Sequence, residues 1–535
     1  MAINPIHRIV VFTGDLNFSV RAGIRALLDA FDDVEIEVLL HRPRRKPSRL
    51  VKNQFRNLRK HGVSWIPYQA WDVGSRLLHR GDPGSGLHLP MPGGPYTMDD
   101  LAADGRVRIT VSPSVNGAAA QRIIEDWSPD LGISLAAPIL KERVFAVPRL
   151  GTINLHKGKL PDYRGMPPAF WEIRDGQPSV GCTIHRVEAA LDKGPIVIET
   201  EVPVEAYSTP EGLRVHLDSE GNRLLVEAVR KFRAGEVGGR TQAGKGKLNS
   251  RPPLPMERQL RRELAAKEGT VGAIRRVKDI VFAGYSWMNA AGRQVRPRPG
   301  RPPVVVLLYH RVNDGFRDNV TIGIERFDRQ MAYLKRHWPV VPLRAVINGD
   351  VDYRGRKPLV CVTFDDGYRD NYDYAAPILL KHRLPATFFV STDKLTNQTP
   401  FEHDLEKLGE GLPNMTWNQV REMLRDGLDF GSHTVNHANL AQISLDRVEV
   451  ELVGSRDTLR AELGQEQFLF AYPFGKQSDI TPEARALVCE TGYACCCSAY
   501  GGINAGSLDL FNILRTGVNF NFSIPALQAR INGWG

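Results

Sequence analysis

The sequence of residues 151–165 is GTINLHKGKLPDYRG, which places Asn154 and His156 two residues apart, just before a loop rich in proline and glycine. Side chains at positions i and i+2 of an extended segment point to the same side. An amide that can donate a hydrogen bond to a developing oxyanion therefore stands beside an imidazole that can hold or pass a proton, and acyl transfer needs both. Taken alone, an Asn-x-His pair is better explained as a strand end with two satisfied polar groups.

Alternating patterns of strand and helix precede and follow this stretch. Short apolar runs alternate with segments that carry apolar residues at helical spacing, and this rhythm predicts a parallel sheet. Residues 130–140, DLGISLAAPIL, end one strand where an open α/β sheet binds its ligand. Gly14 is not part of a G-x-G-x-x-G motif, so a nicotinamide cofactor has no support. The predicted strands are residues 8–14, 34–40, 107–111, 131–135 and 195–204, and the predicted helices are residues 20–31, 118–127 and 210–232.

Three further segments extend the pattern that begins with Asn154 and His156. They are Leu160-Pro-Asp-Tyr-Arg-Gly165, Gly181-Cys-Thr-Ile-His185 and Leu191-Asp-Lys-Gly194. In order and spacing, the whole run resembles the folate-dependent formyltransferases. The resemblance implies an open, Rossmann-like parallel sheet, 10-formyltetrahydrofolate as formyl donor, and catalytic roles for Asn154, His156 and Asp192.

The same resemblance suggests where the folate binds and what differs in this chain. It implies that Leu135, Ala136 and Ile139 hold the pterin, largely through main-chain groups. Many relatives read His-Pro-Ser-Leu-Leu-Pro where this chain has Lys157 and Lys159 in the corresponding loop. These lysines suggest a phosphorylated acceptor, so the departure bears on the identity of the acceptor and not on the chemistry.

The second half of the chain carries a separate group of polar residues. A predicted strand at residues 359–364 leads directly into Asp365 and Asp366. Two adjacent carboxylates are costly to keep ionised together, so a nearby cation is expected. His433 and His437 are four residues apart, a spacing that lets both bind one ion. One carboxylate and two imidazoles leave coordination positions open, as a hydrolytic metal site requires, and the other aspartate is free to act as a base.

Three motifs in this half resemble the polysaccharide deacetylases of the NodB type. They are Thr-Phe-Asp365-Asp366-Gly, His433-x-x-x-His437 and Ala471-Tyr-Pro-Phe-Gly475. The resemblance implies that Asp365 is the general base, that Asp366, His433 and His437 bind a divalent metal, most simply zinc, and that residues 472–475 line the acyl pocket. It also implies a distorted (β/α) barrel.

Two departures from that family pattern concern the catalytic groups. Ala471 stands where an arginine is often found, and no histidine follows His437, although a late Leu-x-His often supplies the general acid. His310, at the end of the predicted strand 304–309, is a candidate replacement. A histidine satisfied by main-chain groups explains His310 equally well.

Length and composition favour more than one domain. A chain of 535 residues exceeds what one core usually serves. We expect a formyltransferase domain at 1–235, a basic linker with helical segments at 236–302, and a deacetylase domain at 303–535. Within the linker, residues 257–267 and 271–289 have helical patterns and residues 296–303 must be extended. The helix at 271–289 suits either a membrane surface or, more commonly, packing on its own domain.

The cysteines and apolar runs indicate the compartment of the protein, and its charge indicates the kind of partner it binds. Six cysteines, three of them adjacent at 495–497, indicate reduced residues of a buried strand, and no run reaches about 18 apolar residues, so a cytoplasmic protein without a membrane span is expected. The net charge of +10 is concentrated at 41–61 and 240–301, which favours anionic partners. Nucleic acid is the least favoured of these, because aromatic residues are not interleaved.

These observations predict a bifunctional enzyme that acts on amino sugars. One half would formylate an amine and the other would remove an acetyl group from an N-acetylated sugar. Three alternatives stay open: formylation of an aminoacyl-tRNA, loss of activity in one half so that it only binds carbohydrate, and removal of formyl instead of acetyl groups by the second half.

Overall fold

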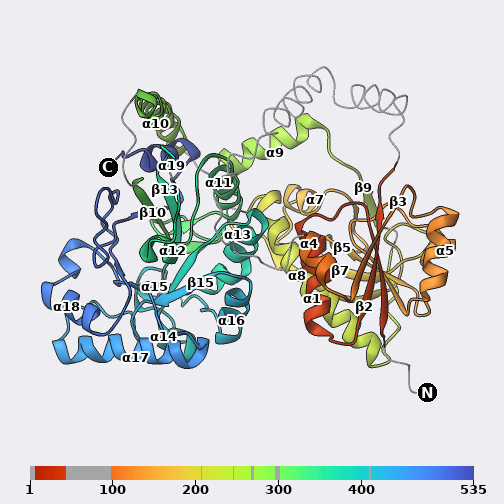
Figure 1. The fold of residues 1–535 in the computed structure, drawn as a ribbon. Helices are drawn as coiled ribbons and strands as arrows, with labels where there is room; N and C mark the ends of the chain where they lie inside the picture. The colour runs from red at the N-terminus through yellow and green to blue at the C-terminus, as the bar shows by residue number, and fades with distance from the viewer. Residues whose placement is uncertain are drawn as a thin grey trace. The chain divides into compact units, whose positions relative to one another are not determined.

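The computed structural model describes residues 6–43, 98–206, 208–244, 246–266, 270–295, 302–353, 355–408 and 411–534. These residues form two compact units, which divide between residues 266 and 270. Most of the basic tract at 41–61 and of the extended segment at 296–303 lies outside the described residues. Figure 1 shows the two units with their helices and strands.

The first unit is built on a seven-stranded sheet of order β3-β2-β1-β4-β5-β7-β8. The five strands β3, β2, β1, β4 and β5 are parallel, as predicted. At the edge beyond β5, β7 pairs antiparallel with β5, and β8 pairs antiparallel with β7. The strands are β1 (Arg8–Thr13), β2 (Glu35–His41), β3 (Val107–Ser112), β4 (Leu131–Ser134), β5 (Thr152–His156), β6 (Tyr163–Gly165), β7 (Ser179–Arg186), β8 (Ile196–Pro203) and β9 (Lys247–Asn249). The helices are α1 (Phe18–Ala30), α4 (Met98–Ala103), α5 (Ala118–Trp127), α6 (Glu142–Phe145), α7 (Phe170–Arg174), α8 (Pro210–Arg233) and α9 (Leu254–Ala266).

Helices cover both faces of this sheet. Alternate residues of a strand point to opposite sides, and in β1 the residues on both sides are apolar, so each face needs a covering layer. Ile9 and Val11 of β1 pack in one core with α1 and α8, while Val10 and Phe12 pack in a second core with α5 and α6. The Asn17 side chain accepts a hydrogen bond from the backbone of α1, which fixes the first turn of that helix. This three-layer arrangement confirms the predicted Rossmann-like fold.

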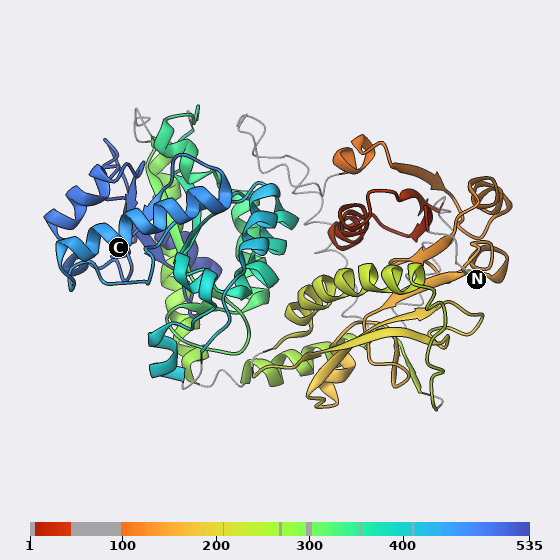
Figure 2. The ribbon, with the colours of Figure 1, turned by 90° about the horizontal axis from the view of Figure 1, so that it is seen from below.

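The second unit is a parallel barrel with the strand order β17-β16-β15-β14-β13-β10-β18. Helices line the outside of these strands (Figure 2). The strands are β10 (Val304–Tyr309), β11 (Arg311–Val312), β12 (Thr321–Ile322), β13 (Leu359–Phe364), β14 (Thr387–Val390), β15 (Asp429–Ser432), β16 (Phe470–Ala471), β17 (Cys496–Cys497) and β18 (Arg515–Gly517). The helices are α10 (Thr270–Val295), α11 (Ile324–His337), α12 (Leu343–Asn348), a π-helix (Asn371–Ala375), α13 (Ala376–His382), α14 (Thr392–Asn397), α15 (Glu402–Leu408), α16 (Trp417–Arg425), α17 (Leu445–Leu463), a 3-10 helix (Gln477–Asp479), α18 (Pro482–Glu490) and α19 (Ile524–Ile531).

A single bridge nearly closes the barrel. Cys497 of β17 pairs in parallel with Ile513, in the segment that leads into β18. Ile513 belongs with Cys361 and Cys497 to one apolar cluster of buried residues from successive strands. The adjacent cysteines 495–497 are free and fully buried, as the sequence predicts. The distorted (β/α) barrel is therefore confirmed.

Two helices occupy much of the segment predicted as a linker. α9 begins at Leu254 and belongs to the first unit, while α10 extends from Thr270 to Val295 and belongs to the second. α10 packs on α19 near the end of the chain. Among the described residues, no helix is long and apolar enough to cross a bilayer.

Candidate active sites

The first site lies where β5 and β7 meet. Asn154 of β5 is paired across the antiparallel ladder with His185 of β7. The Asn154 Nδ2 atom lies 3.1 Å from His185 Nε2, and the His156 and His185 rings are 6.3 Å apart. The predicted pair Asn154 and His156 therefore shares its site with an imidazole that the sequence reasoning had not assigned.

Hydrogen bonds to carbonyl oxygens fix which ring nitrogens carry protons, because a carbonyl oxygen can only accept. His185 Nδ1 donates to the Arg186 oxygen at 2.8 Å, so its Nε2 atom accepts from the Asn154 amide. His156 Nε2 donates to the Tyr163 oxygen at 2.8 Å, which leaves Nδ1 as the free base. His185 thus orients the Asn154 amide, and Tyr163 orients the His156 ring.

Asp192 completes this cluster from the connection between β7 and β8. Its two carboxylate oxygens lie 3.7 Å from His156 Nδ1 and 3.6 Å from His185 Nε2. The Gly165 backbone N–H donates to the carboxylate at 3.1 Å. Burial opposes ionisation, but a proton on the His185 or His156 ring, together with this N–H, holds the pKa of Asp192 below its ordinary value.

The environment of His156 favours the neutral form of its ring. Burial lowers the pKa of His156, although the Asp192 carboxylate opposes the shift. A proton taken up at Nδ1 would face the ionised Asp192 directly. The cluster therefore combines an oriented amide donor, a neutral base and an anion that stabilises the protonated base, which are the groups that transfer of an acyl group to an amine requires.

A buried carboxyl group supports the loop that holds His156. Glu172 of α7 is 2% exposed, and the Lys159 backbone opposes the effect of burial on the pKa of this carboxyl group. The Lys159 carbonyl in turn accepts from the Tyr163 N–H at 2.8 Å, and Tyr163 binds His156. Burial raises the pKa of Glu172 to about 7. No pattern in the sequence marks Glu172, because its importance depends on the folded loop above it.

The two loop lysines are already paired with acids. Lys157 contacts Asp218, and Lys159 Nζ lies 2.5 Å from Glu201. Their charges are thus partly neutralised within the unit, which weakens the argument that they bind a phosphorylated acceptor.

The three residues predicted to hold folate lie after β4, but much of their main chain is occupied. The Leu135 N–H donates to Phe12, and the Ala136 carbonyl accepts from Gly14 at 3.1 Å. The Ile139 carbonyl accepts from Asn116, while the Ile139 side chain is 68% exposed. Folate binding by these residues stays a prediction. Of the three, Ile139 has the exposed side chain that a ligand could contact.

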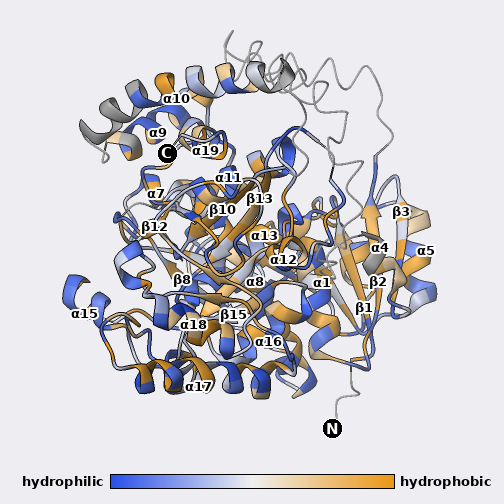
Figure 3. Cartoon of the chain, turned by 60° about the vertical axis from the view of Figure 1, so that its left-hand side comes forward, coloured by the Kyte–Doolittle hydropathy of each residue, from blue (hydrophilic) through white to orange (hydrophobic). Residues whose placement is uncertain are grey.

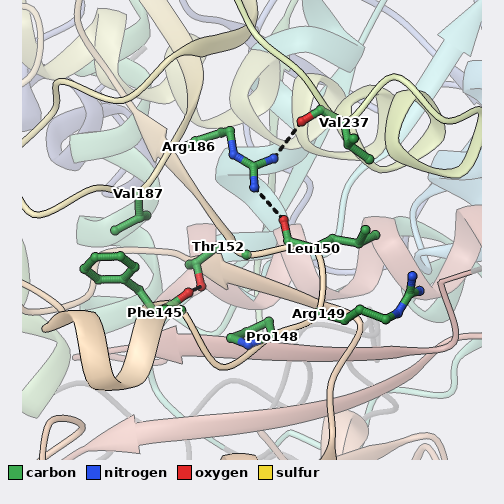
Figure 4. Close-up of a pocket in the computed structure, with 10 residues that line it drawn as sticks. Phe145, Pro148, Arg149, Leu150, Thr152, Arg186, Val187 and Val237 are labelled. Carbon is green, nitrogen blue, oxygen red and sulfur yellow. Dashed lines mark hydrogen bonds between the residues drawn. The ribbon is translucent and has the colours of Figure 1, made fainter.

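A separate cavity of about 430 Å³ lies at the opposite end of β5 (Figure 4). Arg186 crosses it and donates to the Leu150 and Val237 carbonyls at 2.8 and 2.7 Å. Thr152, the first residue of β5, also lines it, whereas Asn154 and His156 do not. The guanidinium ties three segments together, and the cavity is not part of the reaction site.

The second site gathers the predicted metal ligands at the carboxyl ends of β13 and β15. Asp366 Oδ1 lies 3.5 Å from His433 Nε2 and 3.2 Å from His437 Nε2. Ligand atoms from all three residues lie within 4.8 Å of one another. The structure therefore brings together the three residues that the sequence pattern selected.

These atoms fit a divalent cation. The His433 Nδ1 atom donates to the Ala471 carbonyl at 2.8 Å, so its Nε2 lone pair points at Asp366. The Asp366 Oδ1 atom is buried and has no hydrogen-bond partner. Electron pairs that converge on one buried point repel each other unless a cation lies between them, and a carboxylate with two imidazoles is a donor set that zinc accepts.

Asp365 is held by an arginine that the sequence reasoning did not identify. Arg515 of β18 donates through two guanidinium nitrogens to the two Asp365 oxygens, each at 2.7 Å. It also donates to the Ser498 carbonyl at 2.8 Å and lies over the Phe389 ring. Burial opposes ionisation of Asp365, but Arg515 and His433 hold its pKa below the ordinary value. One signal in the sequence was available: a lone arginine within the apolar run ILRTGV, residues 513–518.

The other residues of this site differ in how far they are exposed. Phe474 is half-exposed and its ring centroid lies 5.0 Å from that of His437, so it can line an acyl pocket. Tyr472 is buried, and its hydroxyl contacts Cys496. Burial lowers the pKa of His310, although Asp366 and Asp365 oppose the shift. His403 of α15 lies beside His437 at a centroid distance of 5.5 Å, and Tyr368 Oη is 2.9 Å from its Nε2 atom.

Strained backbone marks both sites. Ten described residues other than glycine have positive φ, and four of them, Asp366, Thr434, His437 and Phe474, belong to the second site. Asp192 of the first site has φ 53°. Such conformations cost on the order of 1–3 kcal/mol each and persist where the surrounding structure enforces them.

Comparison with known proteins agrees with this geometry. A formyl transferase family model matches residues 113–229, and a polysaccharide deacetylase model matches residues 352–495. Asn154, His156 and Asp192 lie within the first match, and all three candidate metal ligands lie within the second. The first family implies a formyl-tetrahydrofolate donor, and the second implies a divalent metal.

Individual relatives match one half at a time. A methionyl-tRNA formyltransferase from Pseudomonas fluorescens is 32% identical over 181 residues, which are 31% of this chain and 57% of the relative. The Streptococcus pyogenes deacetylase PplD, solved with acetate, is 25% identical over 43% of this chain and 99% of its own, with a TM-score of 0.38. A sugar N-formyltransferase from Shewanella is 17% identical over 45% of this chain and 76% of its own, with a TM-score of 0.30.

The chain thus spans little more than half the length of this tRNA formyltransferase. Both matched families are enzyme families, and the two matched regions do not overlap. The protein is a fusion of a formyltransferase domain with a polysaccharide deacetylase domain.

Proposed function

We propose that this chain formylates the amine of an amino sugar, with 10-formyltetrahydrofolate as donor, and removes the N-acetyl group of a sugar in a zinc-dependent reaction. The observation that supports both parts is the presence of two separate polar clusters, each with the groups its reaction needs. Asn154, His156 and Asp192 form the first, and Asp365 with the three metal ligands forms the second.

In the proposed formyl transfer, the Asn154 amide donates to the formyl oxygen as negative charge develops there. His156 takes the proton from the attacking amine at Nδ1, where Asp192 stabilises the resulting imidazolium, and it returns that proton to the folate nitrogen as the bond between this nitrogen and the formyl carbon breaks. His185 and Tyr163 act before the reaction, because their hydrogen bonds hold the amide and the ring in place.

In the proposed deacetylation, Asp366, His433 and His437 would hold the zinc ion. When bound, it would polarise the amide carbonyl and lower the pKa of a water molecule. Asp365 would accept the proton of the attacking water and pass it to the sugar amine as the amide bond breaks, which releases acetate, and Arg515 fixes the direction of the Asp365 carboxylate. Phe474 borders the site, where the methyl of an acetyl group would be shielded from solvent.

A second acceptor is favoured by one comparison: the curated formyltransferase relative acts, by its name, on methionyl-tRNA. The two candidates differ in their dependence on salt. Binding of tRNA should weaken steeply as salt rises, whereas binding of an amino sugar should show a shallow slope.

The deciding experiment is mass spectrometry of products from a panel of amino and acetamido sugars, their nucleotide conjugates and methionyl-tRNA, with and without the folate donor. We expect a gain of one formyl group on an amino sugar only with folate, and loss of one acetyl group without it. Asn154→Ala should lose the first product alone, and the double variant His433→Ala His437→Ala the second alone. Products confined to tRNA would overturn the sugar assignment.

The same panel tests removal of formyl instead of acetyl groups. A formylated sugar incubated without folate would lose its formyl group if the second site prefers the smaller acyl group. Faster loss of formyl than of acetyl would replace deacetylation with deformylation as its activity.

A further inference from the structure

Helix α10 is held on the second unit by one of its faces. The rings of Phe282 and Tyr285 lie edge-on to Trp534, with centroid distances of 5.4 and 4.8 Å. Ser286 is fully buried, and Asp279 accepts a hydrogen bond from Ser523. These contacts fix which side of the helix faces outward.

The outward side is apolar and exposed. Ile280 is 74% exposed and Trp287 is 73% exposed, while Val281 and Met288 are more than half exposed. At 100° per residue these four side chains, with Gly284 between them, occupy an arc of roughly 120° on one side of the helix. Figure 3 shows hydrophobic colouring along α10. Four of the fourteen large exposed hydrophobic residues in the described part of the chain thus fall within nine positions, which is a cluster and not ordinary scatter.

The sequence charge of this helix and of the residues that follow it favours an anionic partner. The α10 sequence holds four basic residues and only one acid, Asp279, which is bonded to Ser523. Lys278 is exposed, and because it lies three positions before Val281 it stands at the Val281 edge of the apolar arc. The chain has no further acid until Asp314, whereas arginines recur at 293, 296, 298 and 301. A second copy of this helix would bring the same positive charge, so self-pairing through this side would be opposed by repulsion.

We propose that α10 is an interfacial helix that docks the second unit on a membrane surface containing anionic lipid. Apolar side chains with tryptophan on one side and basic residues nearby are the features that place a helix in the plane of the headgroups. Ile280, Trp287 and Met288 would enter the boundary between headgroups and acyl chains, and Lys278 would meet lipid phosphates. The inference goes beyond the two proposed activities and does not depend on either.

Co-sedimentation of the full chain with vesicles tests this proposal. One set contains phosphatidylcholine alone, and the other contains about 30% phosphatidylglycerol, each at about 50 and about 500 mM salt. We expect binding to the anionic vesicles at low salt and much weaker binding in the other conditions. Lys278→Glu should weaken binding roughly 5-fold to 30-fold, since each basic residue near the surface contributes about 1 kcal/mol.

The apolar contribution is tested with a matched pair of variants. The double variant Trp287→Ser Met288→Ser should lose at least roughly tenfold in affinity for the anionic vesicles. The control Leu445→Ser Val450→Ser removes two side chains from α17 that are also half exposed or more, and it should bind as the unchanged protein does. Both activities measured in solution should persist in all of these variants.

Three results would overturn the proposal. The first is absence of binding to anionic vesicles at low salt, and the second is equal binding by the α10 variant and the α17 control. The third is occupation of this side by protein. Conversion of a dimer to a monomer by the double variant Trp287→Ser Met288→Ser in light scattering would show this.

Discussion

Replacing Arg515 with methionine should abolish deacetylation while leaving the metal ligands in place. Arg515 and Asp365 are both at most 3% exposed and share two hydrogen bonds of 2.7 Å. Removing one member of a buried pair leaves the other charge uncompensated, which costs on the order of 3–5 kcal/mol of folding free energy. Loss of an oriented general base costs roughly 100-fold to 10,000-fold in rate.

Acetate release from an N-acetylated saccharide and metal content per chain should be measured together. Arg515→Lys keeps a positive charge but cannot bridge both oxygens, so it should fold more readily than Arg515→Met and still lose most activity. The control is Arg344→Met, which removes a similar arginine that contacts Asp429 through two nitrogens where both side chains are partly exposed. This control should lose less stability and keep its activity.

Two outcomes would refute the reasoning about Arg515. Activity of Arg515→Met within tenfold of the unchanged protein would show that the orientation of Asp365 does not limit the reaction. Loss of metal in parallel with activity in Arg515→Lys would show that the arginine acts on the whole site and not on the base.

Three further predictions concern the metal, the first site and its supporting loop. A chelator should stop deacetylation and spare formylation, with recovery when zinc is returned; equal loss of both activities would contradict a metal site confined to the second unit. Because the pKa of His156 lies below 6.5, kcat for formyl transfer with saturating amine should stay level down to about pH 6.5 and then fall. Asp192→Asn should move this fall to lower pH, since Asp192 raises the pKa of His156; movement to higher pH would reverse the assignment. Glu172→Gln should raise the thermal stability of the first unit increasingly from pH 5 to pH 8, by up to about 3 kcal/mol, because the raised pKa of Glu172 makes its ionisation costly in the fold; calorimetry that found the same gain at every pH would exclude this cause.

The residues of each site that could be predicted are those that lie close together in the sequence. Asp365 and Asp366 are adjacent, and the two histidine ligands are four residues apart, so their chemistry is visible without a fold. Strand and helix periodicity likewise predicted the parallel sheet of the first unit, and the family resemblance implied the barrel of the second. The predicted catalytic roles and the expected domain limits stay predictions.

The missing partners depend on which strands become neighbours. His185 orients Asn154 only because β7 runs antiparallel to β5 in one particular register. Arg515 reaches Asp365 only because the last strand pairs beside the first strand of the barrel. Ala471 stands where the family often has an arginine, while Arg515 reaches the site from another strand, and a pattern read along the chain cannot show that contact.

The near closure of the barrel by Cys497 and Ile513 has a consequence for the order in which the protein matures during synthesis. Domains fold as units while the chain emerges from its amino-terminal end. The segment that contains Asp366 and both histidine ligands is complete well before β18 is made. Because the domain folds as a unit, a chain that stops before β18 would lack both the Cys497–Ile513 bridge and the Arg515 guanidinium, so we expect the second site to assemble only after the final strand has left the ribosome.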